Sequence, residues 1–232
     1  MFEPGDIISH ADMCKEEDRM LEAGMNYRCG GTYSVLLMSK RPNAPYNDEV
    51  QDNGRTLIYE GHDWPKSAAH PDPKAVDQPM RNRSGSLTQN GKFFEAAKRH
   101  KDEGTAPELI RVYEKLYSGI WVYNGTFRLI DAWLQESGGR KVFKFRLELT
   151  DEEIGEQDTR DPQILEHARL IPTHVKREVF KRDGGQCVQC GASDNLHFDH
   201  ILPYSKGGTS LKADNIQLLC ARHNLQKHDS IQ

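Results

Sequence analysis

The sequence predicts an α+β protein with two parts of different character. A β-rich region covers residues 1–149, an acidic linker covers 150–170, and a small module covers 171–232. The first region contains apolar and β-branched runs separated by turn residues, a pattern typical of strands. The linker carries 7 Asp and Glu against 2 Lys and Arg. The last region contains two Cys/His pairs with the spacing of a zinc site, which predicts a module stabilised by a bound metal ion.

Four segments of the first region have strand patterns. Residues 32–38 and 55–59 are apolar runs typical of buried strands. Residues 142–149 alternate, with Phe and Leu on one face and Lys, Arg and Glu on the other, which predicts a half-exposed strand. We expect 127–134 to be its hairpin partner, because a Ser-Gly-Gly turn separates the two.

Helices are expected in both regions. Residues 93–101 and 108–117 are the candidates in the first region, and a short helix is expected at 162–169. Residues 60–86 are rich in Pro, His, Asp and Ser, which predicts a long loop with a function. The last region opens with a helix through Val175, Val179 and Phe180, which the Gly184-Gly185 pair ends.

Charge and cysteine content restrict the function. The net charge is −4, yet residues 171–232 carry 8 Lys and Arg against 6 Asp and Glu. This balance excludes binding to nucleic acid through bulk charge alone. The chain has no signal peptide pattern and no apolar run long enough to span a bilayer, so we expect a cytoplasmic protein with reduced thiols. Cys14 and Cys29 are then spare cysteines.

The other three cysteines belong to the predicted zinc site. Two residues separate Cys187 from Cys190, and Cys220 and His223 repeat this spacing thirty residues later. Together they offer the four sulfur and nitrogen ligands that a tetrahedral structural zinc requires. A module of this size buries little core, so we expect the ion to be needed for folding.

The segments between these pairs resemble the HNH nucleases. Residues 196–203, 206–210 and 214–220 follow the order of that family, and the resemblance covers about 171–229. It implies a ββα-metal fold, in which two strands and a helix surround a catalytic divalent ion, and an enzyme that cuts nucleic acid.

The resemblance also implies roles for individual residues. His200 matches the general base, Asp199 the first ligand of the catalytic metal, and Asn215 the central Asn that orients the base and pins its loop. The common ending is Cys-x2-Cys-His, whereas here His223 takes the zinc position and Asn224 the catalytic-metal position. A carboxylate and an amide oxygen suit Mg²⁺ or Mn²⁺.

Three further side chains of this module compete for roles. His197 shares a strand face with Asp199, so it is either a partner of the catalytic residues or an alternative ligand. Lys227 and His228 lie on the expected C-terminal helix, where each is either solvated or a phosphate contact.

The first region resembles the SRA (YDG) domains, which have a β-barrel-like fold and read modified cytosine. The likeness extends over most of 5–150. The segments that carry it are residues 28–37, 45–54 followed by 57–61, and either 117–119 or 122–127, with a further match at Asp77-Gln78.

This resemblance implies a pocket for a base swung out of the DNA duplex. Tyr46 and Tyr59 would sandwich the base, and either Asp48 or Glu49 would accept its amino hydrogens. The chain has one extra residue between Tyr46 and Gly54, and its aligned acid is Glu, so 5-hydroxymethylcytosine is an alternative to 5-methylcytosine. Taken singly, the two tyrosines also fit ordinary strand positions. The segment 61–85, with Trp64, Arg81 and Arg83, is the candidate for entering the duplex.

The combination predicts a modification-dependent restriction endonuclease that uses Mg²⁺ or Mn²⁺ and a structural Zn²⁺. One HNH site cuts one strand, so a double-strand break requires a homodimer or two bound molecules. Two alternatives stay open: an HNH nuclease with sequence-specific targeting, and a non-catalytic reader of modified DNA.

Overall fold

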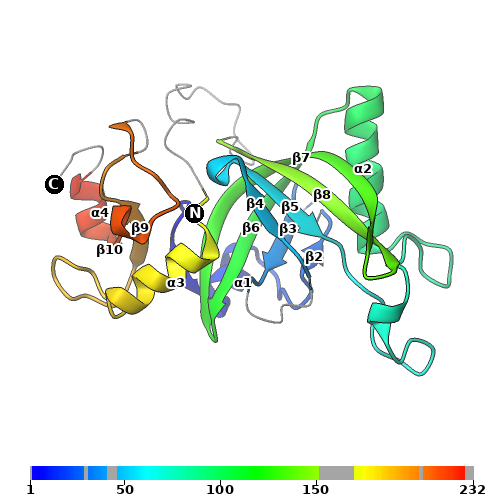
Figure 1. The fold of residues 1–232 in the computed structure, drawn as a ribbon, viewed down its shortest axis with the longest axis horizontal. Helices are drawn as coiled ribbons and strands as arrows, with labels where there is room; N and C mark the ends of the chain where they lie inside the picture. The colour runs from blue at the N-terminus through cyan, green and yellow to red at the C-terminus, as the bar shows by residue number, and fades with distance from the viewer. Residues whose placement is uncertain (1, 29–30, 41–45, 152–169, 204–205, 228–232) are drawn as a thin grey trace.

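The computed structural model describes residues 2–28, 31–40, 46–151, 170–203 and 206–227. A large twisted sheet fills one side of the molecule, and a small module with two strands lies at the other side (Figure 1). The mixed α+β class predicted from the sequence is confirmed. Its elements are β1 (Ile7–Ser9), α1 (His10–Glu16), β2 (Met25–Asn26), β3 (Ser34–Met38), β4 (Glu49–Gln51), β5 (Thr56–Glu60), α2 (Gln89–Glu103), β6 (Glu108–Tyr117), β7 (Ile120–Ser137), β8 (Arg140–Thr150), α3 (Thr173–Arg182), β9 (Leu196–His200), β10 (Ile216–Cys220) and α4 (Ala221–Lys227), with short 3-10 turns at Asp52–Gly54, Pro73–Ala75 and Ala213–Asn215.

The large sheet has the strand order β2-β3-β6-β7-β8-β5-β4, and β1 pairs with β7 outside this path. β3 and β6 are parallel, whereas the other pairs in this sheet are antiparallel. The predicted hairpin of 127–134 and 142–149 is present as the longer pair β7 and β8, which turns through Gly138 and Gly139.

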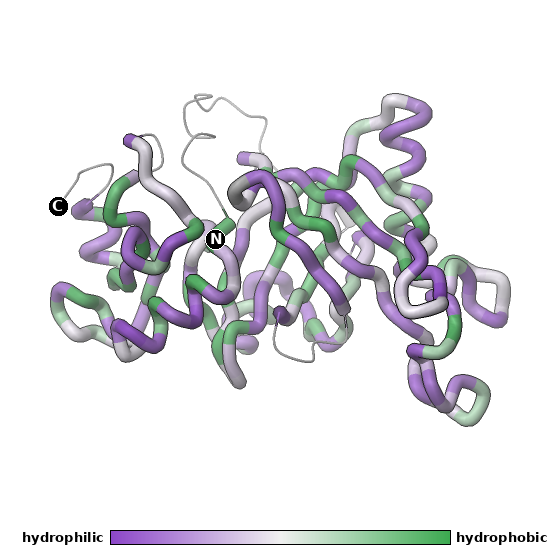
Figure 2. The backbone as a smooth tube through the Cα atoms, in the orientation of Figure 1, coloured by the Kyte–Doolittle hydropathy of each residue, from purple (hydrophilic) through white to green (hydrophobic). Residues whose placement is uncertain are grey.

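Helix α2 packs on the large sheet and covers its main core. The Thr88 hydroxyl accepts a hydrogen bond from the Gly91 amide at its start, and Gly104 ends it in the left-handed conformation. Phe93 and Ala97 of α2 are completely buried in this core. Figure 2 shows hydrophilic and hydrophobic stretches alternating along the helix, as expected for one buried face.

Two expectations for the first region are wrong. Residues 108–117 form the strand β6 and not a helix, because they pair with β3 on one side and β7 on the other. Lys144 of β8 does not face solvent, because its ammonium lies 3.0 Å from the Glu60 carboxylate and only 3% of its side chain is exposed. The short helix expected at 162–169 lies outside the described residues.

The small module shares an apolar core with the large sheet. Val175 and Val179 of α3, together with Leu218 of β10, pack in one cluster with Leu116 of β6 and Val122 of β7. The helix expected after residue 171 is therefore present as α3, and one face of it is covered by the sheet of the first region. No helix in the described part of the chain is long and apolar enough to cross a membrane.

A buried polar network fixes α3 on this sheet. The Lys176 ammonium donates to Glu114 Oε2 at 2.7 Å and to Asn124 Oδ1 at 2.5 Å. The Thr173 hydroxyl donates to the second carboxylate oxygen of Glu114. Burial raises the pKa of Glu114, but the Lys176 ammonium and the hydrogen bonds from Lys176, Thr173 and Asn124 together outweigh that effect and leave the pKa below its usual value. The Glu114 carboxyl is therefore held in its charged form in the interior.

The N-terminal segment makes a second connection between the two parts. The Gly5 amide donates to the Tyr123 carbonyl of β7 at 2.8 Å, and the Gly5 carbonyl accepts from the Phe198 amide of β9 at 3.2 Å. Gly5 has a φ of 103° and a side chain here would meet the Phe198 carbonyl at 3.0 Å, so the close approach requires glycine. Figure 1 shows the N-terminus lying between the large sheet and the small module.

We predict that Lys176→Ala lowers the free energy of unfolding by about 3–5 kcal/mol, because it leaves the Glu114 carboxylate buried without its cation. Lys101→Ala is the matched control. It breaks a half-exposed pair with Asp131 and is expected to cost at most about 1 kcal/mol. Urea unfolding followed by circular dichroism measures both, and equal losses would contradict the structural role assigned to the buried pair.

Candidate nuclease site and base-binding pocket

The four predicted zinc ligands come together in the small module. The sulfur atoms of Cys187, Cys190 and Cys220 and a ring nitrogen of His223 all lie within 4.8 Å of one another. The His223 Nδ1 atom is 3.3 Å from the Cys187 sulfur and 3.4 Å from the Cys220 sulfur, and the Cys190 and Cys220 sulfurs are 3.8 Å apart. A tetrahedron with zinc–sulfur bonds of about 2.3 Å has edges of about 3.8 Å. The donor set and its spacing therefore fit a zinc ion.

His200 lies at the end of β9, where its ring contacts a buried hydroxyl. Its Nε2 atom is 2.8 Å from the Ser210 Oγ atom. Burial lowers the pKa of His200, which favours the neutral imidazole near pH 7. Sequence reasoning missed Ser210, because nothing in the spacing of the two residues indicates their contact.

Asn215 holds the segment that carries Ser210. Its side-chain amide donates to the Leu202 and Thr209 carbonyls, each at 3.0 Å, and its oxygen accepts from the Leu202 amide at 2.9 Å. Gly208 fits beside them only because it has no side chain, since a Cβ atom here would lie 1.8 Å from the Leu202 carbonyl. Asn215 thus closes the loop between β9 and β10, and through that loop it places Ser210 against His200.

Asp199 precedes His200 on β9 and accepts from two side chains. The Lys227 ammonium lies 2.5 Å from its Oδ2 atom, and the Gln217 side-chain amide donates to the same atom at 3.0 Å. Lys227 also donates to the His200 carbonyl. Only 1% of the Lys227 side chain is exposed, so it is neither solvated nor turned toward a phosphate in this structure. The contacts of Gln217 and Lys227 with Asp199 were not predicted from the sequence.

Asn224 is half-buried on α4, one turn before Lys227, so both lie on the helix face toward β9. An oxygen from Asp199 and one from Asn224 are hard ligands of the kind that Mg²⁺ and Mn²⁺ prefer. Asp199 already attracts one cation, the Lys227 ammonium. These two donors match the preference of a divalent cation, but the Lys227 ammonium occupies the Asp199 Oδ2 position in this structure, so an ion bound there would have to displace it.

His197 is paired with a residue outside this group. Its Nδ1 atom pairs with the Asp6 carboxylate of the N-terminal segment, and this contact holds the pKa of His197 above its usual value against the opposing effect of burial. In the structure His197 therefore joins β9 to the N-terminal segment. His228, the other histidine considered for a role here, lies outside the described residues.

The two tyrosines expected to sandwich a base both contact His62. The His62 ring stacks on the Tyr46 ring with 4.9 Å between centroids and 16° between planes, and its Nε2 atom is 3.0 Å from the Tyr59 hydroxyl. Tyr46 is half-buried, whereas only 1% of Tyr59 is exposed. Sequence reasoning missed His62, because it lies in the segment that we expected to be a loop.

The two candidate acids face opposite ways. Asp48 is buried and accepts from the Glu60 amide at 2.9 Å, and burial raises its pKa to about 7. Glu49 is exposed in the short strand β4, where its carboxylate accepts from the side chains of Asn47 and Gln51 at 3.3 Å each. The buried side of this segment therefore offers Asp48 and not Glu49.

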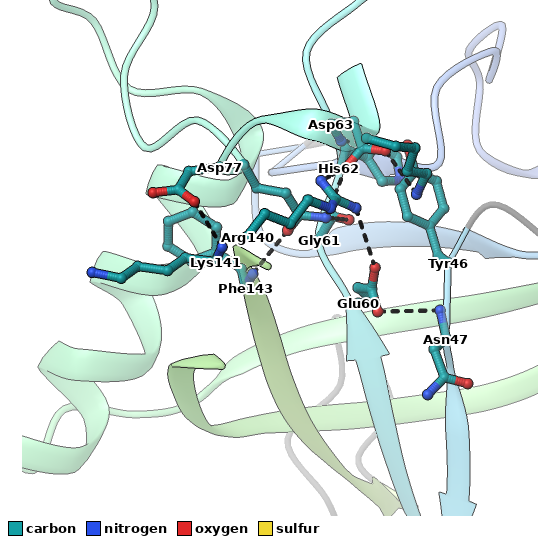
Figure 3. A network of polar contacts seen from close by, with 12 residues as sticks. Tyr46, Asn47, Glu60, Gly61, His62, Asp63, Asp77, Arg140, Lys141 and Phe143 are labelled. Atoms are coloured by element: carbon teal, nitrogen blue, oxygen red, sulfur yellow. Dashed lines mark hydrogen bonds and ion pairs between the residues drawn. The ribbon is translucent and has the colours of Figure 1, made fainter. Parts of the chain in front are cut away.

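A polar network ties the following segment to the sheet (Figure 3). Arg140 lies 2.6 Å from the Asp63 carboxylate, and 7% of its side chain is exposed. The Gln78 side chain donates to the Gly61 carbonyl at 2.6 Å and accepts from the Phe143 amide, while Asp77 accepts from the Lys141 amide. The Asp77-Gln78 pair noted in the sequence thus connects this segment to β8.

The long segment between β5 and α2 forms one side of a hollow with a volume of about 540 Å³. Trp64 stacks on His70 with 4.6 Å between ring centroids, and both line the hollow together with His62 and Arg83. Arg81 lies apart from it and donates to the Gly85 carbonyl. Whether Trp64, Arg81 or Arg83 enters a DNA duplex stays a prediction.

Comparison with protein families identifies the small module. Residues 187–230 match the family model of the HNH endonucleases, so the C-terminal part of this chain is an HNH endonuclease domain. The match spans all four zinc-site residues as well as Asp199, His200, Asn215 and Asn224. No curated protein matches the chain.

Comparison with solved structures finds the SRA domain of SUVH5 and two longer proteins. The structure of the SUVH5 SRA domain with methylated CHH DNA is 20% identical, with a TM-score of 0.45 over 66% of this chain and 91% of that one. KRYPTONITE in complex with mCHH DNA, a histone H3 peptide and SAH is 18% identical, with a TM-score of 0.43 over 70% and 34%. Arabidopsis thaliana SUVH6 with SAM is 20% identical, with a TM-score of 0.42 over 87% and 32%.

We predict that Cys187→Ser lowers the zinc content of the purified protein and reduces its thermal stability, because metal binding and folding are coupled in such small modules. Cys14→Ser is the control, since Cys14 lies on α1 and outside the cluster. Elemental analysis and thermal melts measure the two effects. An unchanged zinc content in Cys187→Ser would exclude the Cys3His site.

A second prediction concerns the buried carboxyl of Asp48. Its pKa is raised from 3.8 to about 7, so the native state holds a proton that the unfolded chain loses between these values, and stability falls as the pH rises through this window. Asp48→Asn removes this loss and is expected to be more stable than wild type at pH 8 by on the order of 2–4 kcal/mol, with the advantage shrinking toward pH 4. Urea unfolding across this pH range measures it. Glu49→Gln, at an exposed position, should show no such trend; a parallel trend would contradict the assignment to Asp48.

Proposed function

We propose that this protein is a modification-dependent restriction endonuclease, which binds DNA containing 5-methylcytosine or 5-hydroxymethylcytosine and hydrolyses a phosphodiester bond. The observation that carries the proposal is the arrangement of Asp199, His200 and Asn215 inside the segment that matches the HNH endonucleases. A structural zinc module needs none of these three, which argues against a non-catalytic reader.

The side chains of the nuclease site have separate roles in this reaction. His200, neutral near pH 7, accepts the proton of the attacking water. Asn215 holds the loop that places Ser210 against His200, so the imidazole keeps one orientation. Asp199 and Asn224 would hold Mg²⁺ or Mn²⁺, which supplies positive charge to the phosphate oxygens as negative charge develops. The four zinc-site residues would hold a structural Zn²⁺ that keeps β10 and α4 in place.

Target choice is assigned to the first region, 1–149, joined by the linker 150–170 to the nuclease region 171–232. The SRA-like sequence motifs place Tyr46, Asp48 and Tyr59 in a pocket for a base swung out of the duplex. The contacts of both tyrosines with His62 support this assignment. Asp48 is the preferred acid, because it is buried near Tyr59 whereas Glu49 is exposed.

Strand cleavage on both sides of a site requires two nuclease sites. Each chain supplies one, so we propose that a homodimer makes the double-strand break. A nuclease with sequence-specific targeting is the alternative that shares the same cutting site. It predicts equal cleavage of modified and unmodified DNA.

We predict that the wild-type protein with Mg²⁺ or Mn²⁺ cuts a cytosine-methylated plasmid and spares the unmethylated plasmid. His200→Ala is expected to slow cleavage by roughly 10²–10⁴-fold, because only the general base of the reaction is lost. Binding to methylated DNA is expected to stay unchanged. His174→Ala, at an exposed position of α3, is the control. Equal cleavage of both plasmids would favour sequence-specific targeting, and absence of cleavage with retained binding would favour a non-catalytic reader. Activity of His200→Ala above a tenth of wild type would remove His200 as the base.

A further inference from the structure

The Tyr59 ring is part of the main core, which limits what it can do in a base pocket. It packs in one cluster with Phe93 and Phe145, and 1% of the residue is exposed. A base that stacked on this ring would have to separate it from the core. The Tyr59 hydroxyl is the polar part, and it lies 3.0 Å from the ring of His62.

The His62 ring, unlike the buried Tyr59 ring, is only partly buried and lies beside Tyr46. It lies parallel to the half-buried Tyr46 ring at 4.9 Å, and it also borders the hollow of about 540 Å³. A flat base between two rings makes two contacts of about 3.5 Å, so the rings must be about 7 Å apart. The Tyr46 and His62 rings therefore have to separate by about 2 Å from the observed 4.9 Å for a base to enter, and because His62 is held by its other contacts, Tyr46 has to make this movement.

His62 is also fixed in a defined orientation. Its amide donates to the Asn90 side chain at 2.8 Å, and the Asn90 side chain donates back to the His62 carbonyl at 2.8 Å. Gly24 lies against the same end of the ring as the Tyr59 hydroxyl, where a Cβ atom would be 2.6 Å from the Cε1 and Nε2 atoms. With the Tyr59 hydroxyl, these contacts hold both the backbone and the plane of His62.

The chemistry of the two rings suits an uncharged base. Burial lowers the pKa of His62 to about 4, so the imidazole is neutral near pH 7 and stacks without introducing a charge. The acid that would read the base edge is close by, because the Asp48 carboxyl accepts from the amide of Glu60, two residues before His62.

We propose that His62 and Tyr46 form the two walls of the slot for the modified base, and that Tyr59 is a positioning residue that anchors His62 through its hydroxyl. This rests on the proposed function and deepens it. It differs from the sandwich of two tyrosines that the SRA resemblance implies, in which the Tyr59 ring itself would contact the base.

The test measures Kd for two otherwise identical duplexes, one with a single 5-methylcytosine and one without. His62→Ala and His62→Leu are expected to weaken binding to the methylated duplex by roughly 5- to 150-fold, as for one lost base stack, and to leave binding to the unmethylated duplex unchanged. His62→Phe keeps a wall and is expected to retain most of the discrimination. Leu fills the space of the ring, so the result does not depend on the alanine variant folding.

Tyr59 is tested through its hydroxyl alone. Tyr59→Phe is expected to reduce discrimination, and to add nothing further in the His62→Leu background, because Tyr59 acts through His62. Tyr123→Phe is the control, since it removes another buried hydroxyl, 3.1 Å from Thr126, in a different cluster. Melting temperature and zinc content report folding of each variant.

The outcomes separate this proposal from the proposed function. If the wild type discriminates while His62→Leu keeps full discrimination, or if Tyr59→Phe weakens binding independently of His62, the slot is not where we place it and the reader assignment stands. If the wild type binds both duplexes equally, the proposed function fails and the slot fails with it.

Discussion

The Cys3His group is the constraint on which the nuclease site depends. Its ligands come from the turn after α3, from the end of β10 and from α4, so one ion would join all three. The two strands of the module have five residues each, which is too little for an independent core. β10 pairs with β9 along its whole length and continues directly into α4, so the position of α4 beside Asp199 and His200 depends on that of β10. Loss of the zinc ligands would therefore displace Asp199 and His200 through movement of the backbone.

The sequence predicted the residues of this site but not their contacts. The spacing of the two zinc-ligand pairs, each with two residues between its members, predicted the zinc ligands, whereas the roles of Asp199 and His200 were predicted from the resemblance to the HNH nucleases. Lys227 was expected to be solvated or to touch phosphate, yet its ammonium is buried against Asp199. That contact depends on how closely α4 approaches β9, a tertiary distance that no local pattern contains.

The same limit explains the errors in the first region. Residues 108–117 lack the alternation of a half-exposed strand, because β6 lies inside the sheet and is buried on both faces, and such a strand is hard to tell from a helix by its pattern. Lys144 alternates like a solvent-facing residue, but Glu60 and the Asn47 carbonyl accept its hydrogens in the interior. The stacking of His62 on Tyr46 links residues sixteen positions apart, through strand β5 and its pairing with β4.

The apolar cluster that α3 and β10 share with the β6–β7 hairpin bears on how such proteins can be recombined. The nuclease region would expose Val175 and Val179 if it were excised, and the hairpin would expose Leu116 and Val122. The N-terminal Gly5 would likewise lose its partner at Phe198. A functional chimera must therefore exchange the hairpin and the N-terminal segment together with the cutting module. Grafting the zinc-binding residues alone onto a different DNA-binding protein would leave exposed apolar surface on both proteins, and such surface promotes aggregation.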